Sequence, residues 1–140
     1  MRKLDQRGVA ALEFGLVAAP LFILMFAIFD LGRYAITMQS LRALSNAGAR
    51  TWMIDNCYVT SAIKKIAPTC SGDPLPSVTA KKDVAPFLYS VGTGLAPTLT
   101  TASGVSALTV TASEPGFRMI VPIIWGTAFN DPSASTKIPF

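Results

Sequence analysis

The sequence contains no histidine and only two cysteines among its 140 residues. Histidine is the side chain most often used for acid and base catalysis and for metal binding, so its absence removes the commonest catalytic and metal sites. Outside the first fifty residues, the carboxylates stand singly in the sequence, at Asp55, Asp73, Asp83, Glu114 and Asp131. Walker, Rossmann and nucleophile-elbow patterns are absent as well. The sequence therefore predicts a protein that is not an enzyme and that uses no cofactor or metal.

Charge is also scarce. Only 14% of the residues are charged, whereas 51% are hydrophobic. Of the formal net charge of +4, the basic segment at residues 1–7 supplies +2. Nucleic-acid-binding proteins carry basic stripes, often interleaved with aromatic residues, and no such stripe occurs here. We therefore expect no nucleic acid among the partners.

The hydrophobic excess lies largely in one long run near the N-terminus. Residues 14–29 carry no charge, and residues 9–29 would form a helix about 32 Å long, which matches the roughly 30 Å hydrocarbon core of a bilayer. The positive-inside rule keeps the basic segment before the run in the cytoplasm. A cleaved secretory signal is disfavoured because Pro20 follows Ala18 and Ala19 and the run continues beyond them. An uncleaved signal anchor, carrying an extracytoplasmic domain that binds an envelope partner, remains an alternative.

Glu13 is the exception within this apolar segment. A carboxylate in a spanning helix costs about 2.5 to 3.5 kcal/mol on insertion scales, so it points to a function that needs the charge. The alternative is that Glu13 lies at the cytoplasmic interface and stays hydrated at little cost.

The residues around Glu13 favour the functional interpretation. Gly8 followed by Val9 resembles the cleavage site of type IV prepilins, in which a dedicated peptidase cuts after the glycine. Glu13 stands fifth after this cut, as in that family, and Phe14 is the aromatic residue that follows the glutamate in the Tad (tight adherence) branch. Glycine suits the cut because a residue without Cβ lets the backbone lie extended in a narrow active site.

The next part of the chain narrows the resemblance. The run D-L-G-R-Y at residues 30–34, followed by a small-residue segment that ends A-G-A-R at Arg50, is similar to TadE-like minor pilins or pseudopilins. Asp30 is a departure, because the family often has glutamate there. An ion pair between Asp30 and Arg33, three residues apart, is as consistent with the pattern as a role in assembly.

The resemblance implies a minor pilin that supports pilus initiation, surface adhesion or biofilm formation. It implies four partners: a prepilin peptidase, other pilin subunits, the pilus assembly platform and the lipid bilayer. The protein would lie in the bacterial inner membrane before assembly and in an extracellular pilus or the periplasm afterwards. In the filament, the new ammonium of Val9 would compensate the buried charge of Glu13 and fix the register of neighbouring helices. A major, filament-forming subunit is a further alternative.

These features predict three regions: a cytoplasmic leader at residues 1–8, a long helix at residues 9–55 and a small extracytoplasmic head at residues 56–140. The helix would be embedded in the membrane at residues 9–29 and amphipathic at residues 30–55. Pro20 predicts a kink or local melting around residues 16–20, because proline removes a helical hydrogen bond. The similarity to pilins, with a sheet following a long helix, implies an α+β fold.

The amphipathic half should bury one face against the head. The residues expected on that face are Leu31, Tyr34, Ala35, Met38, Leu41, Leu44 and Trp52, with Arg33, Gln39, Arg42 and Asn46 largely off it. Small residues at 43–49 would allow another backbone to approach closely. Gly48 supports such a contact, since glycine costs a helix about 1 kcal/mol.

The head shows weaker patterns. Cys57 and Cys70 are expected to form a disulfide worth about 3 kcal/mol in an oxidising compartment. Short helices are predicted at residues 59–66 and 82–90. Alternation predicts a strand at residues 108–112, a type II turn at Pro115 and Gly116, a returning strand at residues 117–121 and a third strand at residues 133–138.

Overall fold

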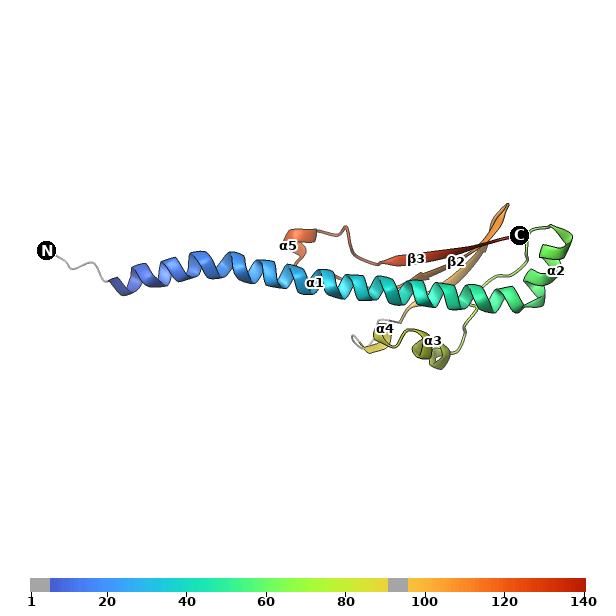
Figure 1. Cartoon of the computed structure of the whole chain (residues 1–140), viewed down its shortest axis with the longest axis horizontal. Helices are drawn as coiled ribbons and strands as arrows, with labels where there is room; N and C mark the ends of the chain where they lie inside the picture. Colours follow the sequence, from blue (N-terminus) through green and yellow to red (C-terminus); the bar gives the residue numbers. More distant parts are fainter. Residues whose placement is uncertain (1–5, 91–95) are drawn as a thin grey trace.

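The fold is built on a single long helix, against which the other elements pack. The computed structural model describes residues 6–90 and 96–140, so most of the expected leader, at residues 1–5, lies outside the described residues. Helix α1 (Gln6–Ile54) has 49 residues, which corresponds to a length of about 74 Å. Its N-terminal half projects from the molecule, and the head packs around its C-terminal half (Figure 1). The continuous helix predicted from residue 9 onward is confirmed.

Helix α1 continues through Pro20. Residues 16–20 are all helical, so the local melting that we considered there is not present. The alternative effect of Pro20, a kink, stays a prediction. Membrane helices tolerate proline where neighbouring groups can satisfy the freed carbonyl.

Three antiparallel strands form the sheet of the head. Strands β1 (Thr98–Ser103), β2 (Ala107–Ser113) and β3 (Ser133–Pro139) lie in the order β1-β2-β3. In β2, Leu108, Val110 and Ala112 are fully buried and alternate with half-buried threonines. The strands predicted at residues 108–112 and 133–138 are therefore confirmed, as is the α+β fold class.

The prediction of a strand at residues 117–121 is wrong. The turn before it does form, because Gly116 has φ +90° and the amide of Phe117 donates to the carbonyl of Glu114 at 3.4 Å. The chain then runs in irregular structure to the short helix α5 (Pro122–Trp125). Strand β2 already has β1 on one side and β3 on the other, so it offers no free edge. Strand β1 was missed by the sequence analysis.

The short helices differ from the predictions at their ends. Helix α2 (Asn56–Lys64) confirms the first of them but begins earlier, because the Asp55 carboxylate accepts the amide of Cys57 at 2.9 Å as an N-cap. The single helix predicted at residues 82–90 is instead two, α3 (Val78–Val84) and α4 (Phe87–Ser90). Pro86 separates them, since proline has no amide hydrogen and disfavours helical geometry in the residue before it.

The core lies where α1 crosses the sheet. Leu41 and Leu44 of α1 are fully buried against Leu108, Val110 and Ile138 of the sheet. In Figure 1 the sheet lies on one side of α1, and α3 and α4 lie on the other. Two side-chain hydrogen bonds join helix to sheet, one between the hydroxyls of Ser45 and Thr136 at 3.0 Å and one from the Trp52 indole to Thr101 at 2.8 Å.

The predicted amphipathic face is correct only in part. Leu31 and Ala35 were expected in the core but are exposed, because the sheet covers α1 farther along the chain. Gly48, by contrast, makes the expected close approach. A Cβ at this position would lie 2.8 Å from Pro74 Cγ, 3.0 Å from Leu99 Cδ2 and 3.2 Å from Val110 Cγ1.

Candidate processing and assembly site

The N-terminal half of α1 is uncovered by the rest of the chain. The most apolar 18-residue window in α1 has a mean hydropathy of 2.3, and none of its residues is buried. The large apolar side chains that are exposed here are Val9, Leu12, Phe14, Leu16, Val17, Leu21, Phe22, Ile23, Leu24, Met25, Phe26, Ile28 and Phe29. Burial of such side chains is worth about 1.5 to 3 kcal/mol each, so this surface requires a bilayer or neighbouring helices. Helix α1 is long and apolar enough to cross a membrane.

The residues of the predicted cleavage site lie at the start of this helix. Gly8 and Val9 are exposed, and nothing described lies within 4 Å of a Cβ built on Gly8. The peptide bond between them is therefore clear of the head. It is also helical, and a helix end with glycine opens easily into the extended form that a peptidase needs.

Glu13 lies one helical turn after Val9, on the same face. Its side chain is exposed, and no ion pair or hydrogen bond to it occurs among the described residues. Phe14 beside it is 72% exposed. Within the part of the chain that the structure describes, Glu13 is thus an unpaired carboxylate in an apolar surface. If that surface is buried, the charge requires a cation from outside the head.

A second polar site lies at the other end of the apolar surface. Asp30 is fully buried, and its two carboxylate oxygens accept the amides of Ile120 at 3.0 Å and Val121 at 2.9 Å. The Arg33 guanidinium also donates to Asp30, at 3.4 Å. The ion pair with Arg33 was anticipated from the sequence, but the backbone contacts were not. We call this arrangement the Asp30 junction, because it joins α1 to the segment before α5.

Aromatic rings pack around the Asp30 junction. Tyr34 lies 5.0 Å from Phe129 and 6.3 Å from Phe117, measured between ring centroids, and Trp125 lies 5.5 Å from Phe129. The Arg33 guanidinium stacks over the ring of Phe117 at 5.1 Å. A signal for this cluster was available in the sequence, since three of the four rings fall within residues 117–129.

The comparisons with known proteins address the part of the chain that contains these two sites. Residues 8–50 match the family model described as TadE-like protein. We call residues 8–50, which are similar to this family, the TadE-like segment. No curated protein and no solved structure matches the chain at a significant level. The TadE-like match confirms the resemblance drawn from Gly8, Glu13 and the run at residues 30–34, and it supports a pilin-like protein associated with a Tad pilus.

The disulfide lies just beyond the TadE-like segment. Cys57 and Cys70 are bonded, with their Cα atoms 5.5 Å apart, and Cys70 is buried in the core. The bond joins the start of α2 to the loop that leads to α3. Among the described residues there is no cluster of three or more histidine, cysteine, aspartate or glutamate side chains that could hold a metal.

One carboxylate of the head is buried without a charge partner. Glu114 is 3% exposed, and its Oε2 has no hydrogen-bond partner among the described residues. Burial raises the pKa of Glu114 to about 7. The pKa of Tyr89 is raised by burial and, to a smaller extent, by the negative charges of Glu114 and Asp73. Glu114 is therefore expected to change its protonation state near neutral pH.

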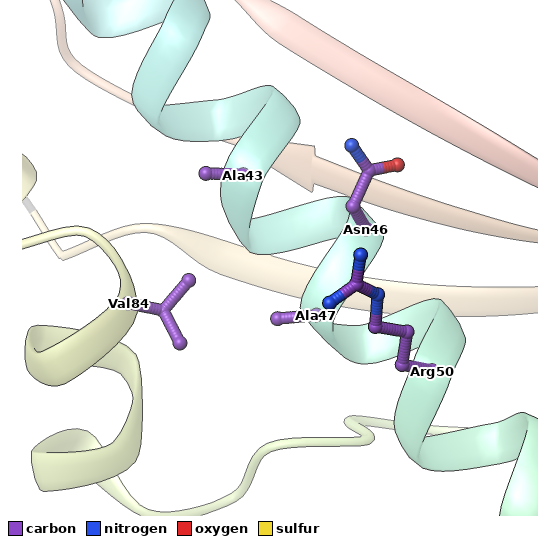
Figure 2. Close-up of a pocket in the computed structure, with 5 residues that line it drawn as sticks. All are labelled: Ala43, Asn46, Ala47, Arg50 and Val84. Atoms are coloured by element: carbon purple, nitrogen blue, oxygen red, sulfur yellow. The ribbon is translucent and has the colours of Figure 1, made fainter.

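An open groove lies between α1 and the end of α3 (Figure 2). It is lined by Ala43, Asn46, Ala47 and Arg50 of the TadE-like helix and by Val84 at the end of α3. The small residues of α1 are thus divided between two faces. Gly48 and Ala49 are buried against the head, whereas Ala43 is exposed at the groove.

Proposed function

We propose that this chain is a TadE-like minor pilin of a Tad-type pilus, cleaved after Gly8 by a prepilin peptidase and assembled through the apolar half of α1. The observation that supports this most strongly is the TadE-like match, which spans both Gly8 and Glu13. The structure adds that this half of the helix is uncovered by the head. The proposed role is structural and non-catalytic.

The chemistry of assembly follows from the exposed carboxylate. In the bilayer, Glu13 lies near the cytoplasmic end of the helix and can stay hydrated. When helices pack into a filament core, that hydration is lost, and an unpaired carboxylate would be strongly penalised. Cleavage creates an ammonium on Val9, which compensates the charge of Glu13 on a neighbouring subunit when the axial offset is correct. Apolar burial supplies adhesion, and the ion pair supplies register.

The proposed topology places the leader in the cytoplasm and the head outside the inner membrane. The bonded pair Cys57 and Cys70 agrees with this orientation, since disulfides persist in oxidising compartments. The proposed partners are the peptidase, other pilin subunits, the assembly platform and the lipid bilayer.

The decisive experiment is the intact mass and N-terminal sequence of the protein from cells with and without their prepilin peptidase. We expect a chain that begins at Val9 only when the peptidase is present. Gly8→Val should block cleavage, whereas Gly15→Val should not. The two are matched, because nothing described lies within 4 Å of a Cβ at either glycine. A chain that keeps its leader in peptidase-positive cells would leave an uncleaved membrane-anchored protein as the conclusion.

A further inference from the structure

Apolar side chains are exposed on and just before α5. Ile120 is 64% exposed, Ile123 is 96% exposed and Ile124 is 40% exposed, and Trp125 beside them is half-buried. Four large apolar residues thus lie within six positions of the chain. An exposed apolar cluster of this kind marks a site where a membrane or another molecule displaces water.

The Asp30 junction fixes where this cluster lies along α1. The amides of Ile120 and Val121 are bound by Asp30, and the uncharged run of α1 ends at Phe29, one residue earlier. In Figure 1, α5 is the part of the head nearest the projecting half of α1. If residues 9–29 cross the bilayer, the cluster lies at the level where the hydrocarbon ends on the extracytoplasmic side.

We propose that Ile120, Ile123, Ile124 and Trp125 insert into the outer leaflet of the bilayer, at the boundary between headgroups and acyl chains. Helix α5 lies beside α1 close to the end of its exposed apolar surface, which needs the same solvent (Figure 1). The composition of the cluster suits that depth, since tryptophan and tyrosine are enriched at membrane interfaces and short apolar elements can lie in the interface plane. The head is thereby held against the membrane at a second point.

The charges near the cluster are paired, and this specifies the lipid chemistry. Arg33 is bound to Asp30, and Arg118 is bound to Asp131 at 2.9 Å. Neither of these two arginines is therefore a free cation for anionic headgroups among the residues that the structure describes. Apolar burial drives the insertion, and we expect it to occur equally in zwitterionic and anionic bilayers.

The inference rests on α1 spanning the membrane, which is part of the proposed function, but not on cleavage or on pilus assembly. The two tryptophans of the chain, Trp52 and Trp125, provide the probes. Trp52 lies near the opposite end of the head, close to the end of α1. The full chain would be placed in vesicles of phosphatidylethanolamine and phosphatidylcholine, with and without phosphatidylglycerol, that contain lipids brominated at shallow or deep positions of the acyl chains.

In the variant Trp52→Phe, we expect bromine to quench Trp125, with shallow bromines more effective than deep ones. In Trp125→Phe, we expect no quenching of Trp52. Co-sedimentation with vesicles shows separately that α1 is inserted. Equal, negligible quenching of both tryptophans in chains that co-sediment would overturn the proposal. The proposal would also be overturned if Trp125 became more shielded from an aqueous quencher as the protein density rose, while lipid bromination had no effect. A second copy of the chain would then be the partner.

A charge variant tests the insertion directly. Ile123→Asp should abolish the excess quenching of Trp125, because it places a carboxylate in the interface. Val105→Asp is the matched control and should leave the quenching unchanged, since Val105 is 100% exposed in the turn between β1 and β2. Quenching that survives Ile123→Asp would also overturn the proposal. Cleavage after Gly8 should be unaffected in both variants, so failure of this inference is distinguishable from failure of the proposed function.

Discussion

Asp30 positions the head on the helix through three contacts to one buried carboxylate. Asp30→Ala would leave the amides of Ile120 and Val121 without their acceptor. Each buried, unsatisfied amide costs about 1 to 3 kcal/mol, so we expect a loss of roughly 2 to 6 kcal/mol in the local stability of this segment. Hydrogen exchange of the two amides measures it directly.

The control for this prediction is Asp131→Ala. Asp131 also accepts a backbone amide, from Gly116 at 2.7 Å, and a guanidinium, but its side chain is 51% exposed. Water can replace Asp131 as a partner, so we expect a smaller change there. Equal protection of the Ile120 and Val121 amides in the wild type and in Asp30→Ala would contradict the role assigned to Asp30.

Glu114 makes the stability of the head depend on pH. Burial raises its pKa from the ordinary 4.5 to about 7, so the folded head binds a proton that the unfolded chain releases. The free energy of unfolding should therefore fall as the pH rises from about 4.5 to about 7, by about 3 kcal/mol in all, and stay low above that range. Urea unfolding of the full chain in detergent, at about pH 5.5 and about pH 8, tests this.

The variant Glu114→Gln keeps the shape and removes the titration, so its stability should not change over the same pH window. Tyr89 is a neighbouring ionisable group, since the charge of Glu114 contributes to the raised pKa of Tyr89. A wild-type head that is more stable at the higher pH would contradict the prediction.

At the scale of elements, α1, α2 and two of the strands could be predicted because their patterns are local, whereas α5 was missed and the helix predicted at residues 82–90 proved to be two. The long helix follows from hydrophobicity and spacing, and the alternation at residues 108–112 reads directly as a strand. Strand β1 could not be found in this way. Its residues, Thr98–Ser103, include only one buried side chain, Leu99, so the alternation that marks a strand is nearly absent.

Two shortcomings of the sequence analysis have one cause. A strand was wrongly predicted at residues 117–121, and the backbone contacts of the Asp30 junction were not predicted. Nothing in the sequence shows that Asp30, about ninety residues earlier in the chain, takes the amides of Ile120 and Val121. Turn chemistry at Pro115 and Gly116 predicted the change of direction correctly, but turn chemistry does not specify which acceptor the following amides meet. Long-range pairing of polar groups is the part of this fold that local patterns leave open.

The packing of α1 on the sheet depends on a missing side chain at Gly48. Gly48→Ala would place a methyl group 2.8 Å from Pro74 and 3.0 Å from Leu99. We expect it to destabilise the head by about 1 to 3 kcal/mol despite the better helix propensity of alanine. Gly32→Ala is the matched control, because nothing described lies within 4 Å of its Cβ. It should be neutral or stabilising by up to about 1 kcal/mol, and thermal unfolding compares the two. A stabilising Gly48→Ala would show that the neighbours can move apart.

For the molecule as a whole, α1 divides into a half that the head covers and a half that it leaves uncovered. The head explains the apolar positions of α1 after Asp30. The apolar positions before Asp30 are explained only by surroundings outside the chain. The proposed cleavage and assembly residues, Gly8 and Glu13, belong to a short contiguous pattern, so the hypothesis about them could be drawn from the sequence alone. Because they are isolated from the head, we expect substitutions there to leave the fold intact.

The position of the carboxylate in the uncovered half is the last prediction. Exchanging neighbours, as Leu12→Glu with Glu13→Leu, keeps the composition and hydropathy of the segment but moves the charge by about 100° and 1.5 Å along the helix. If Glu13 sets the register with the Val9 ammonium, this exchange should reduce the pilus-associated protein to the level of Glu13→Ala, measured in sheared filaments. Cleavage after Gly8 should continue.

The control for this exchange moves no charge: Leu21→Phe with Phe22→Leu lies in the same exposed apolar surface and should assemble normally. Because both exchanges conserve hydropathy, membrane insertion cannot account for a difference between them. A different outcome is that assembly survives the charge exchange and fails only in Glu13→Ala. That outcome would show that the segment needs a carboxylate but does not need it at position 13. The register function of Glu13 would then be wrong, while its charge would still be required.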